Sequence, residues 1–292
     1  MSKADIDIEP TLPFATLTRA QLVEGLRQLG LQPGDNVAVH SALSSLGQVE
    51  GGAEAVIMAL LDVIGPAGTL LAPYFFPLYE GALDWARPPL PYTGAIPCEL
   101  RAWPGAQLSL HPSHPVVALG PAARRLTDGH LRASAVGLGS PFDRLAQLGG
   151  QVLLLGVSQA TNTTIHTGEA YARVPYWGRP RPDRPAGREV LVPGQAPVWV
   201  PLTDYPGDSA GFTKLEPWLV ERGLITFGQL GRARCRRMPA QPLIDATVAF
   251  LQRQPDGLLC DRLGCAYCAW ARSFLPGSAA ALTPAGLPAE KT

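Results

Sequence analysis

The chain has 292 residues, of which 46% are hydrophobic and 16% are charged. This composition is typical of a globular enzyme and excludes an intrinsically disordered chain. Lysine plus arginine balances aspartate plus glutamate at 24 residues each, so the charge gives no reason to expect nucleic acid or an anionic membrane as a partner.

The N-terminal stretch MSKADIDIEPTLPF is acidic and interrupted by proline, unlike the basic and apolar segments of a signal peptide. The longest apolar runs, such as residues 56–64, are too short to span a membrane. The five cysteines are an odd number, which favours reduced thiols. We therefore expect a cytoplasmic protein, either a monomer or a homodimer.

Helical and extended patterns alternate along the first quarter of the chain. Residues 18–30 predict a helix, because TRAQ has the spacing of a capping box and leucines form one stripe. Residues 36–40 (NVAVH) predict a buried strand, residues 51–64 a second amphipathic helix, and residues 68–75 (GTLLAPYF) another strand. This order indicates an α/β fold with parallel crossovers.

Two Pro-rich stretches, residues 77–115 and 179–194, show no periodicity and are predicted to be connections; a loop as long as the first is usually functional. Residues 151–156 (QVLLLG) predict a central strand. Helices are predicted near residues 121–126, 140–148, 161–172, 215–223 and 242–254. We expect residues 1–292 to form a single domain, with an N-terminal extension at 1–15 and a flexible tail at 276–292.

His166 and Glu169 lie three residues apart on a predicted helix that follows the central strand. This spacing places both side chains on one helix face, at the edge where open α/β sheets hold ligands. An imidazole beside a carboxylate can act as a general base. The same spacing also occurs by coincidence, with the histidine packed and the glutamate solvated.

His40 ends a predicted strand and is followed by the hydroxyl-rich loop SALSSLG. Such a loop offers serine hydroxyls and backbone N–H groups to a phosphate, although serine loops are commonly plain turns. The loop has no P-loop lysine.

Two further groups could bind a metal. His111 and His114 lie three residues apart on a proline-rich segment without further ligands at a recognisable spacing. Cys260, Cys265 and Cys268 have better metal spacing but no evident fourth ligand, so buried packing is the simpler interpretation.

Other catalytic patterns are absent from the sequence. There is no G-x-S-x-G elbow, since Ser158 lies in GVSQA, and no G-x-G-x-x-G follows the first strand. Cys98 has no histidine near it in the sequence.

Several ordered segments resemble the antibiotic N-acetyltransferase family, whose best-known members are the aminoglycoside 3-N-acetyltransferases. The resemblance covers residues 17–273, and ordered matches are more specific than any single motif. The matching segments are residues 26–75, with HSALSSLG and GTL; residues 94–120, with HPSH; SPF at 140–142; LLLGVSQATNTTIHTGEA at 153–170; and GQLGRARCRRM with a late cysteine pair.

The resemblance implies an α/β fold distinct from the GNAT acetyltransferases, with a mixed sheet, helices on both faces, and two closely packed lobes with acetyl-CoA between them. It assigns catalysis to His166 and Glu169. By the same resemblance, the residues that bind the coenzyme are His40, Ser41, Ser44, Ser45, Gly68, Thr69, His111, Ser113 and His114.

The implied activity is transfer of an acetyl or other short acyl group from acyl-CoA to a primary amine, directly and without a resident metal. The acceptor would contact Tyr74, Phe75, Glu80 and Asp84. Leu108 and Pro115 depart from the family pattern, which usually has arginine and serine there. Glu80 and Asp84 are the only acids between residues 77 and 92, whereas a polycationic aminoglycoside favours several carboxylates.

Three alternatives therefore stay open. The first is a biosynthetic N-acyltransferase that acts on an amine other than an aminoglycoside. The second is a metal-dependent hydrolase that uses His111, His114, His166 and Glu169. The third is a protein that binds coenzyme A without catalysis.

Overall fold

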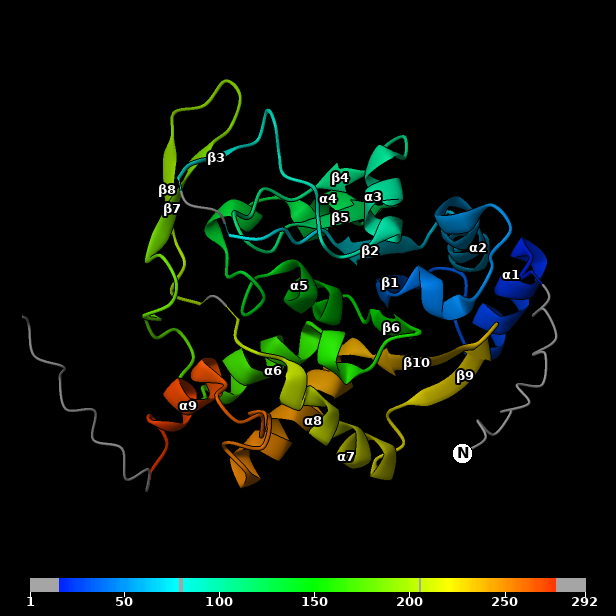
Figure 1. Cartoon of the computed structure of the whole chain (residues 1–292). Coiled ribbons are helices and arrows are strands. Elements are labelled where there is room, and N and C mark those ends of the chain that lie inside the picture. Colours follow the sequence, from blue (N-terminus) through cyan, green and yellow to red (C-terminus); the bar gives the residue numbers. More distant parts are fainter. Residues whose placement is uncertain (1–15, 79–80, 205, 277–292) are drawn as a thin grey trace, which may run out of the picture.

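A mixed seven-stranded sheet runs through the centre of the protein (Figure 1). The computed structural model describes residues 16–78, 81–204 and 206–276. The central strands β2, β1 and β6 are parallel, and the outer strands are antiparallel to their neighbours. In spatial order the strands are β4 (Gln107–Leu108), β5 (Val116–Leu119), β2 (Thr69–Pro73), β1 (Asn36–Ser41), β6 (Gln151–Leu155), β10 (Ala233–Pro239) and β9 (Thr226–Leu230).

Helices cover both faces of this sheet (Figure 1). The helices on one face are α1 (Arg19–Gln28), α2 (Gly52–Ile64) and α3 (Ala95–Ala102). The helices on the other are α4 (Ala123–Thr127), α5 (Pro141–Gln147), α6 (Thr164–Ala172), α7 (Glu216–Glu221), α8 (Ala240–Arg253) and α9 (Ala266–Arg272).

The side-chain alternation of the central strands builds one hydrophobic core on each face. On β1, Val37 and Val39 pack in the core with α1 to α3, whereas Ala38 packs in the core with the other helices. Parallel strands need cover on both faces, which is why they are apolar at successive positions. The expected α/β class, with a mixed sheet and helices on both faces, is confirmed.

A second, three-stranded sheet stands beside the main one (Figure 1). It contains β3 (Leu83–Asp84), β7 (Gly187–Leu191) and β8 (Val198–Pro201). The sequence predicts only connections here, and that prediction is wrong at β3 and β7. These strands are short, and β3 pairs with β7 across about a hundred residues of chain, so no local pattern marks them.

The stretch predicted as one long loop, residues 77–115, also contains α3 and β4. Helix α3 spans only eight residues and contains Pro97, so it is too short to show a helical periodicity in the sequence. It nevertheless buries Ile96 and Leu100. Other helices agree with prediction: α1 begins with the Thr18–Gln21 capping box, and Ser140 caps α5.

Residues 1–15 and 277–292, predicted as an extension and a tail, lie outside the described residues. Within the described part of the chain, no helix combines the length and the apolar character needed to cross a bilayer.

Candidate active site

The carboxyl ends of β1 and β6 lie side by side, with Ser41 paired to Leu155. His40 and Ser41 end β1, and the chain leaves β6 through a short 3₁₀ helix, η3 (Gln159–Thr161), to enter α6. Open α/β sheets bind ligands outside this edge. The strand order therefore brings the start of α6 next to the serine loop, although more than a hundred residues separate them in sequence.

His166 and Glu169 form a hydrogen-bonded pair on one face of α6. The distance between His166 Nδ1 and Glu169 Oε2 is 2.5 Å, and both side chains are buried. The phenol of Tyr176 donates to the other carboxylate oxygen, Oε1, at 2.9 Å. Burial, followed by the charge of Glu169, raises the pKa of Tyr176 and keeps the phenol protonated as a donor. With Nδ1 engaged, Nε2 is the ring nitrogen left for chemistry.

Aromatic packing and a close helix contact hold this pair in place. The ring of Phe212 meets the His166 imidazole edge-on, with the ring centres 4.6 Å apart. Helix α8 approaches α6 so closely that a Cβ at Gly168 would lie 2.5 Å from Thr247. Glycine at this position is required for the approach, because it removes the side chain that would separate the helices.

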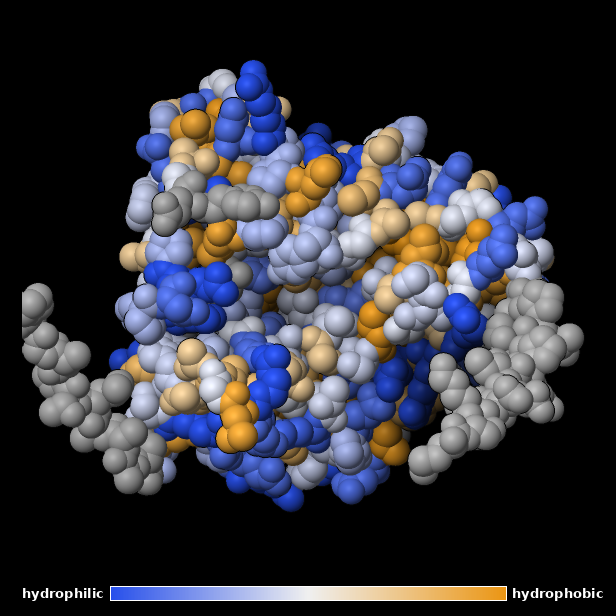
Figure 2. All heavy atoms as spheres, viewed as in Figure 1, coloured by the Kyte–Doolittle hydropathy of each residue, from blue (hydrophilic) through white to orange (hydrophobic). Residues whose placement is uncertain are grey.

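A cavity of about 1140 Å³ opens at this edge of the sheet, and Figure 2 shows the surface hollowed near the middle of the view. Single-ligand pockets are usually smaller, at about 300–1,000 Å³, so two substrates can share this one. Among the residues that the structure describes, six of the side chains predicted for the site line the cavity: His40, Ser41, Ser44, Phe75, His114 and His166.

The HPSH segment forms a compact network behind the cavity. The Nδ1 atom of His111 accepts the backbone N–H groups of Ser113 and His114, at 3.3 and 3.2 Å. It is therefore unprotonated, and the ring is neutral. The Ser113 hydroxyl bridges Nδ1 of His111 and Nδ1 of His114, and the His111 ring stacks on His130 at 4.7 Å. His114 is the one histidine of this network that lines the cavity.

Burial makes the histidines around the cavity poor proton acceptors. It lowers the pKa of His40 to about 3, and likewise that of His130. Burial, followed by the charges of neighbouring histidines, holds the pKa of His111 and of His114 well below the usual range. At neutral pH these four rings are uncharged.

Comparison with known proteins identifies the family. The family model described as aminoglycoside 3-N-acetyltransferase matches residues 38–252. This chain belongs to that family. Aminoglycoside N(3)-acetyltransferase III from Salmonella is 33% identical over 268 residues, covering 81% of this chain and 92% of the relative. A type IX enzyme from Micromonospora chalcea is 35% identical over 269 residues, covering 81% of this chain and 94% of the relative.

Solved structures of aminoglycoside 3-N-acetyltransferases share the fold. The apoenzyme of aminoglycoside acetyltransferase AAC(3)-IVa superposes with a TM-score of 0.79 at 30% identity, covering 89% of this chain and 98% of the other. The enzyme AAC-IIIb, solved as a binary complex with coenzyme A, superposes with a TM-score of 0.69 at 29% identity, covering 82% of this chain and 98% of the other. The expected enzyme class, an acyl-CoA-dependent N-acetyltransferase with the acyl-CoA as co-substrate, is confirmed.

Some residues that the family resemblance assigns to the coenzyme lie away from the cavity. Gly68 and Thr69 lie at the amino-terminal ends of the parallel strands, away from the cavity, because Thr69 begins β2 beside Asn36, at the start of β1. The Thr69 hydroxyl accepts the N–H of Ala122 there. Ser45 packs against Gly156, where an added Cβ would lie 2.5 Å from the Ser45 side chain. In this family member the structure does not bring these three residues to the cavity.

The residues assigned to the acceptor are likewise divided. Phe75 lines the cavity, but Tyr74 is buried in the core, and its hydroxyl accepts from Arg101 at 2.8 Å. Asp84 is exposed on β3 and caps its own turn by accepting the N–H of Ala86. Glu80 lies outside the described residues.

In the described parts of the chain, the cavity is also lined by four charged residues and a tyrosine that the sequence did not single out. Arg181, Asp183 and Arg184 reach it from the connection after α6, and Asp208 and Tyr267 from later segments. Arg181 pairs with both carboxylate oxygens of Asp183, at 3.0 and 2.7 Å. The RPRPDR stretch is the one sequence signal that could have drawn attention to them.

The hydrolase alternative requires His111, His114, His166 and Glu169 to converge on a metal. Among the described residues these four do not form a group of potential ligands. The Glu169 carboxylate is engaged by His166 and Tyr176. A different group of side chains does converge, and it includes the three cysteines near the C-terminus.

Proposed function

We propose that the enzyme transfers an acetyl or other short acyl group from acyl-CoA to a primary amine of an aminoglycoside-like acceptor, with His166 as the general base. The observation that carries this proposal is that His166 lines the cavity while its Nδ1 is held by Glu169.

The chemical step needs a base because an ammonium group has no lone pair with which to attack a thioester. His166 Nε2 takes one proton from the acceptor ammonium, and the freed nitrogen lone pair bonds to the acyl carbon. The second proton that this nitrogen loses goes to the sulfur as the carbon–sulfur bond breaks, so the coenzyme leaves as a thiol. Glu169 stabilises the imidazolium that forms. Nitrogen–carbon bond formation is thus matched by carbon–sulfur cleavage, and transfer is direct.

The surrounding histidines favour this role for His166. His114 is close enough that the charge of His166 contributes to the lowering of its pKa. Since His40, His111, His114 and His130 are neutral at physiological pH, the ring that is paired with a carboxylate is the one suited to accept a proton. The shared cavity contributes proximity, worth several kcal/mol of the barrier.

We propose that the coenzyme lies along Ser41 and Ser44 and approaches His114 with its thioester. Ser41 ends β1, Ser44 lies in the short 3₁₀ helix that follows (Leu43–Leu46), and both line the cavity. The relative solved with coenzyme A supports acyl-CoA at this site. Relatives solved with gentamicin and with apramycin support an aminoglycoside-like acceptor in the rest of the cavity.

A second candidate acceptor, an amine with fewer positive charges, is favoured by the pairing of the cavity carboxylates. Asp183 is bound by Arg181 and lies 3.6 Å from Arg184, and Asp208 pairs with Arg262. Carboxylates that are already paired attract a polycation less than free ones. The fold and the general base would be the same for such an acceptor, but the enzyme would then have a biosynthetic role.

The test is a product assay on the purified enzyme. Acetyl-, malonyl- and succinyl-CoA are each combined with a panel of aminoglycosides and monoamines, and products are identified by mass spectrometry. We expect one acyl-CoA to acylate a primary amine, and His166→Ala to reduce the rate on the order of 100-fold or more with an unchanged melting temperature. Full activity in His166→Ala would refute the general base. An enzyme that binds coenzyme A but acylates no amine would refute the transferase activity on these acceptors.

A further inference from the structure

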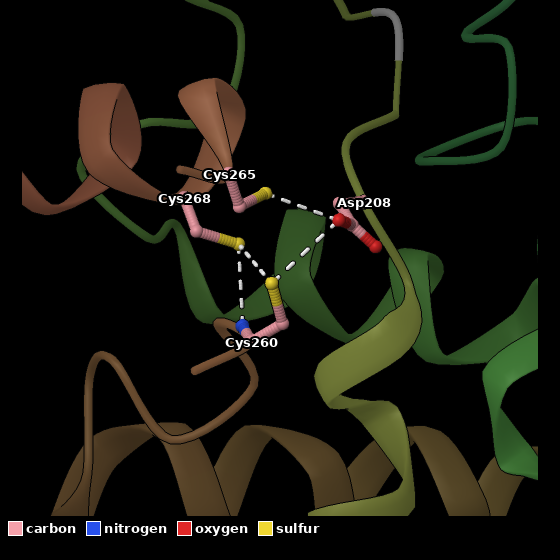
Figure 3. A group of neighbouring side chains, drawn as sticks. All are labelled: Asp208, Cys260, Cys265 and Cys268. Atoms are coloured by element: carbon pink, nitrogen blue, oxygen red, sulfur yellow. Dashed lines mark hydrogen bonds between the residues drawn. The ribbon is translucent and has the colours of Figure 1, made fainter. Parts of the chain in front are cut away.

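Three cysteines and an aspartate from separate segments meet at one point near the C-terminus (Figure 3). Cys265 caps α9 and Cys268 lies in its first turn, Cys260 belongs to the loop before it, and Asp208 precedes the 3₁₀ helix η4 (Ala210–Leu215). One ligand atom from each residue lies within 4.8 Å of the others. The aspartate is a fourth potential ligand, which the cysteine spacing alone does not reveal.

The separations between these atoms are close to those of a tetrahedral metal site. Sγ of Cys268 lies 3.4 Å from Sγ of Cys260, and Oδ2 of Asp208 lies 3.1 Å from Sγ of Cys265 and 3.6 Å from Sγ of Cys260. Around a zinc ion with bonds of about 2.3 Å to sulfur and about 2.0 Å to oxygen, tetrahedral ligands lie roughly 3.5–3.8 Å apart. Side-chain shifts of a few tenths of an ångström would bring these three separations to the values expected around zinc.

Hydrogen-bond donors and arginine side chains surround the cluster. The backbone N–H of Cys260 donates to Sγ of Cys268 at 3.2 Å, the kind of contact that orients a metal ligand. Arg262 pairs with Asp208, and Arg272 donates to the carbonyl of Cys260 at 3.0 Å. Three thiolates and a carboxylate leave a zinc complex with net negative charge, which these two arginines offset.

We propose that Asp208, Cys260, Cys265 and Cys268 bind one zinc ion. Thiolates select zinc over magnesium or calcium, which prefer oxygen ligands. All four positions of the tetrahedron are taken by protein, so the site is closed and its role is structural.

The zinc site connects the C-terminal segment to the wall of the active-site cavity. Asp208 lines the cavity. Tyr267, which lies between Cys265 and Cys268 in the sequence, lines it as well. Beside Asp208, a Cβ at Gly207 would lie 1.7 Å from the Tyr267 ring, so backbone and ring are in direct contact. The metal would fix this wall without taking part in the chemistry, whatever acceptor the enzyme uses.

The first measurement is the metal content of the full-length protein, purified with a thiol reductant and without a chelator. We expect about one zinc per chain in the wild type by mass spectrometry of the elements, and less than about a tenth in Cys265→Ser and in Cys268→Ser. Cys98→Ser and Cys235→Ser are the matched controls, since both cysteines lie outside the cluster, and both should keep the wild-type zinc content.

The second measurement does not depend on how the cysteine variants fold. Wild-type protein stripped of metal is titrated with Co²⁺ in the presence of reductant. We expect thiolate-to-cobalt absorption and tetrahedral cobalt bands that saturate at one ion per chain. Asp208→Cys should retain the metal and increase the thiolate-to-cobalt band by about one third, because a fourth thiolate replaces the carboxylate.

Two results would overturn the proposal. One is wild-type protein that contains no zinc as purified and, after metal is added, shows neither tetrahedral cobalt bands nor protection of its thiols from alkylation. The other is a disulfide between Cys260 and Cys268 in protein purified without oxidant, because that bond removes two of the ligands.

Discussion

His166 Nδ1 and Glu169 Oε2 approach to 2.5 Å, and both side chains are buried. Glu169→Gln keeps the size of the side chain but removes the charge that stabilises an imidazolium. We expect kcat to fall about 100-fold, with little change in the KM for acyl-CoA. Steady-state kinetics with acyl-CoA varied at saturating acceptor measure both quantities. Glu54→Gln, on the exposed side of α2, is the control and should retain the wild-type kcat. A wild-type kcat in Glu169→Gln would show that the carboxylate does not assist the histidine.

Tyr176 holds the second oxygen of Glu169, so we interpret it as a positioning residue. Tyr176→Phe removes a hydrogen bond to a charged group, which contributes about 1.5–3 kcal/mol. We expect kcat/KM to fall about tenfold and the acidic limb of its pH profile to shift. The control is Tyr171→Phe, which removes a similar bond to Asp143 outside the cavity lining. Equal effects of the two variants on the pH profile would argue for a general structural role.

Asp183 offers the acceptor a carboxylate that the sequence did not indicate. Its side chain is 51% exposed and paired with arginine, so its interaction with a bound cation is worth at most about 1 kcal/mol. For Asp183→Asn we expect the KM for a polycationic aminoglycoside to rise about two- to fivefold, and the KM for a monoamine to change less. Asp84→Asn tests the position predicted from the family resemblance and should leave both KM values unchanged. The reverse pattern would place the acceptor along β3.

Acid should destabilise the protein well before its carboxylates titrate. Burial lowers the pKa of His130 to about 3 in the folded state, whereas it is about 6.5 in the unfolded chain. Between these values the unfolded chain binds more protons, so stability is complete above pH 6.5 and is lost as the pH falls toward 3. For this one histidine the loss is about 2 kcal/mol between pH 7.5 and pH 5.

Urea unfolding of the wild type and of His130→Gln at these two pH values isolates this contribution. The variant should have a lower free energy of unfolding at pH 7.5. Between pH 7.5 and pH 5, however, its free energy of unfolding should fall by about 2 kcal/mol less than that of the wild type. Because other titrating groups are common to both proteins, they cancel in the difference. Identical pH dependence in the two proteins would contradict the assignment.

The parts of the fold carried by local pattern were predictable from the sequence. The apolar runs of β1 and β6 and the capped helix α1 are determined by periodicity and capping, which act within a few residues. The His166–Glu169 pair was also visible, because a three-residue spacing on a helix fixes which side chains meet. Strands β3 and β7 were not, since β3 is two residues long and pairs with a strand about a hundred residues away, and β7 lies between β3 and β8.

The cavity and the metal cluster were decided by tertiary structure. Thr69 and Ser41 lie in neighbouring parallel strands, yet the register places them at opposite ends of those strands. No sequence motif indicates this register. Asp208 lies more than fifty residues before its cysteine partners. Groups so distant in sequence meet only after the two hydrophobic cores have packed the helices on the sheet. Local sequence thus determined which residues could carry chemistry, and packing determined which of them share a site.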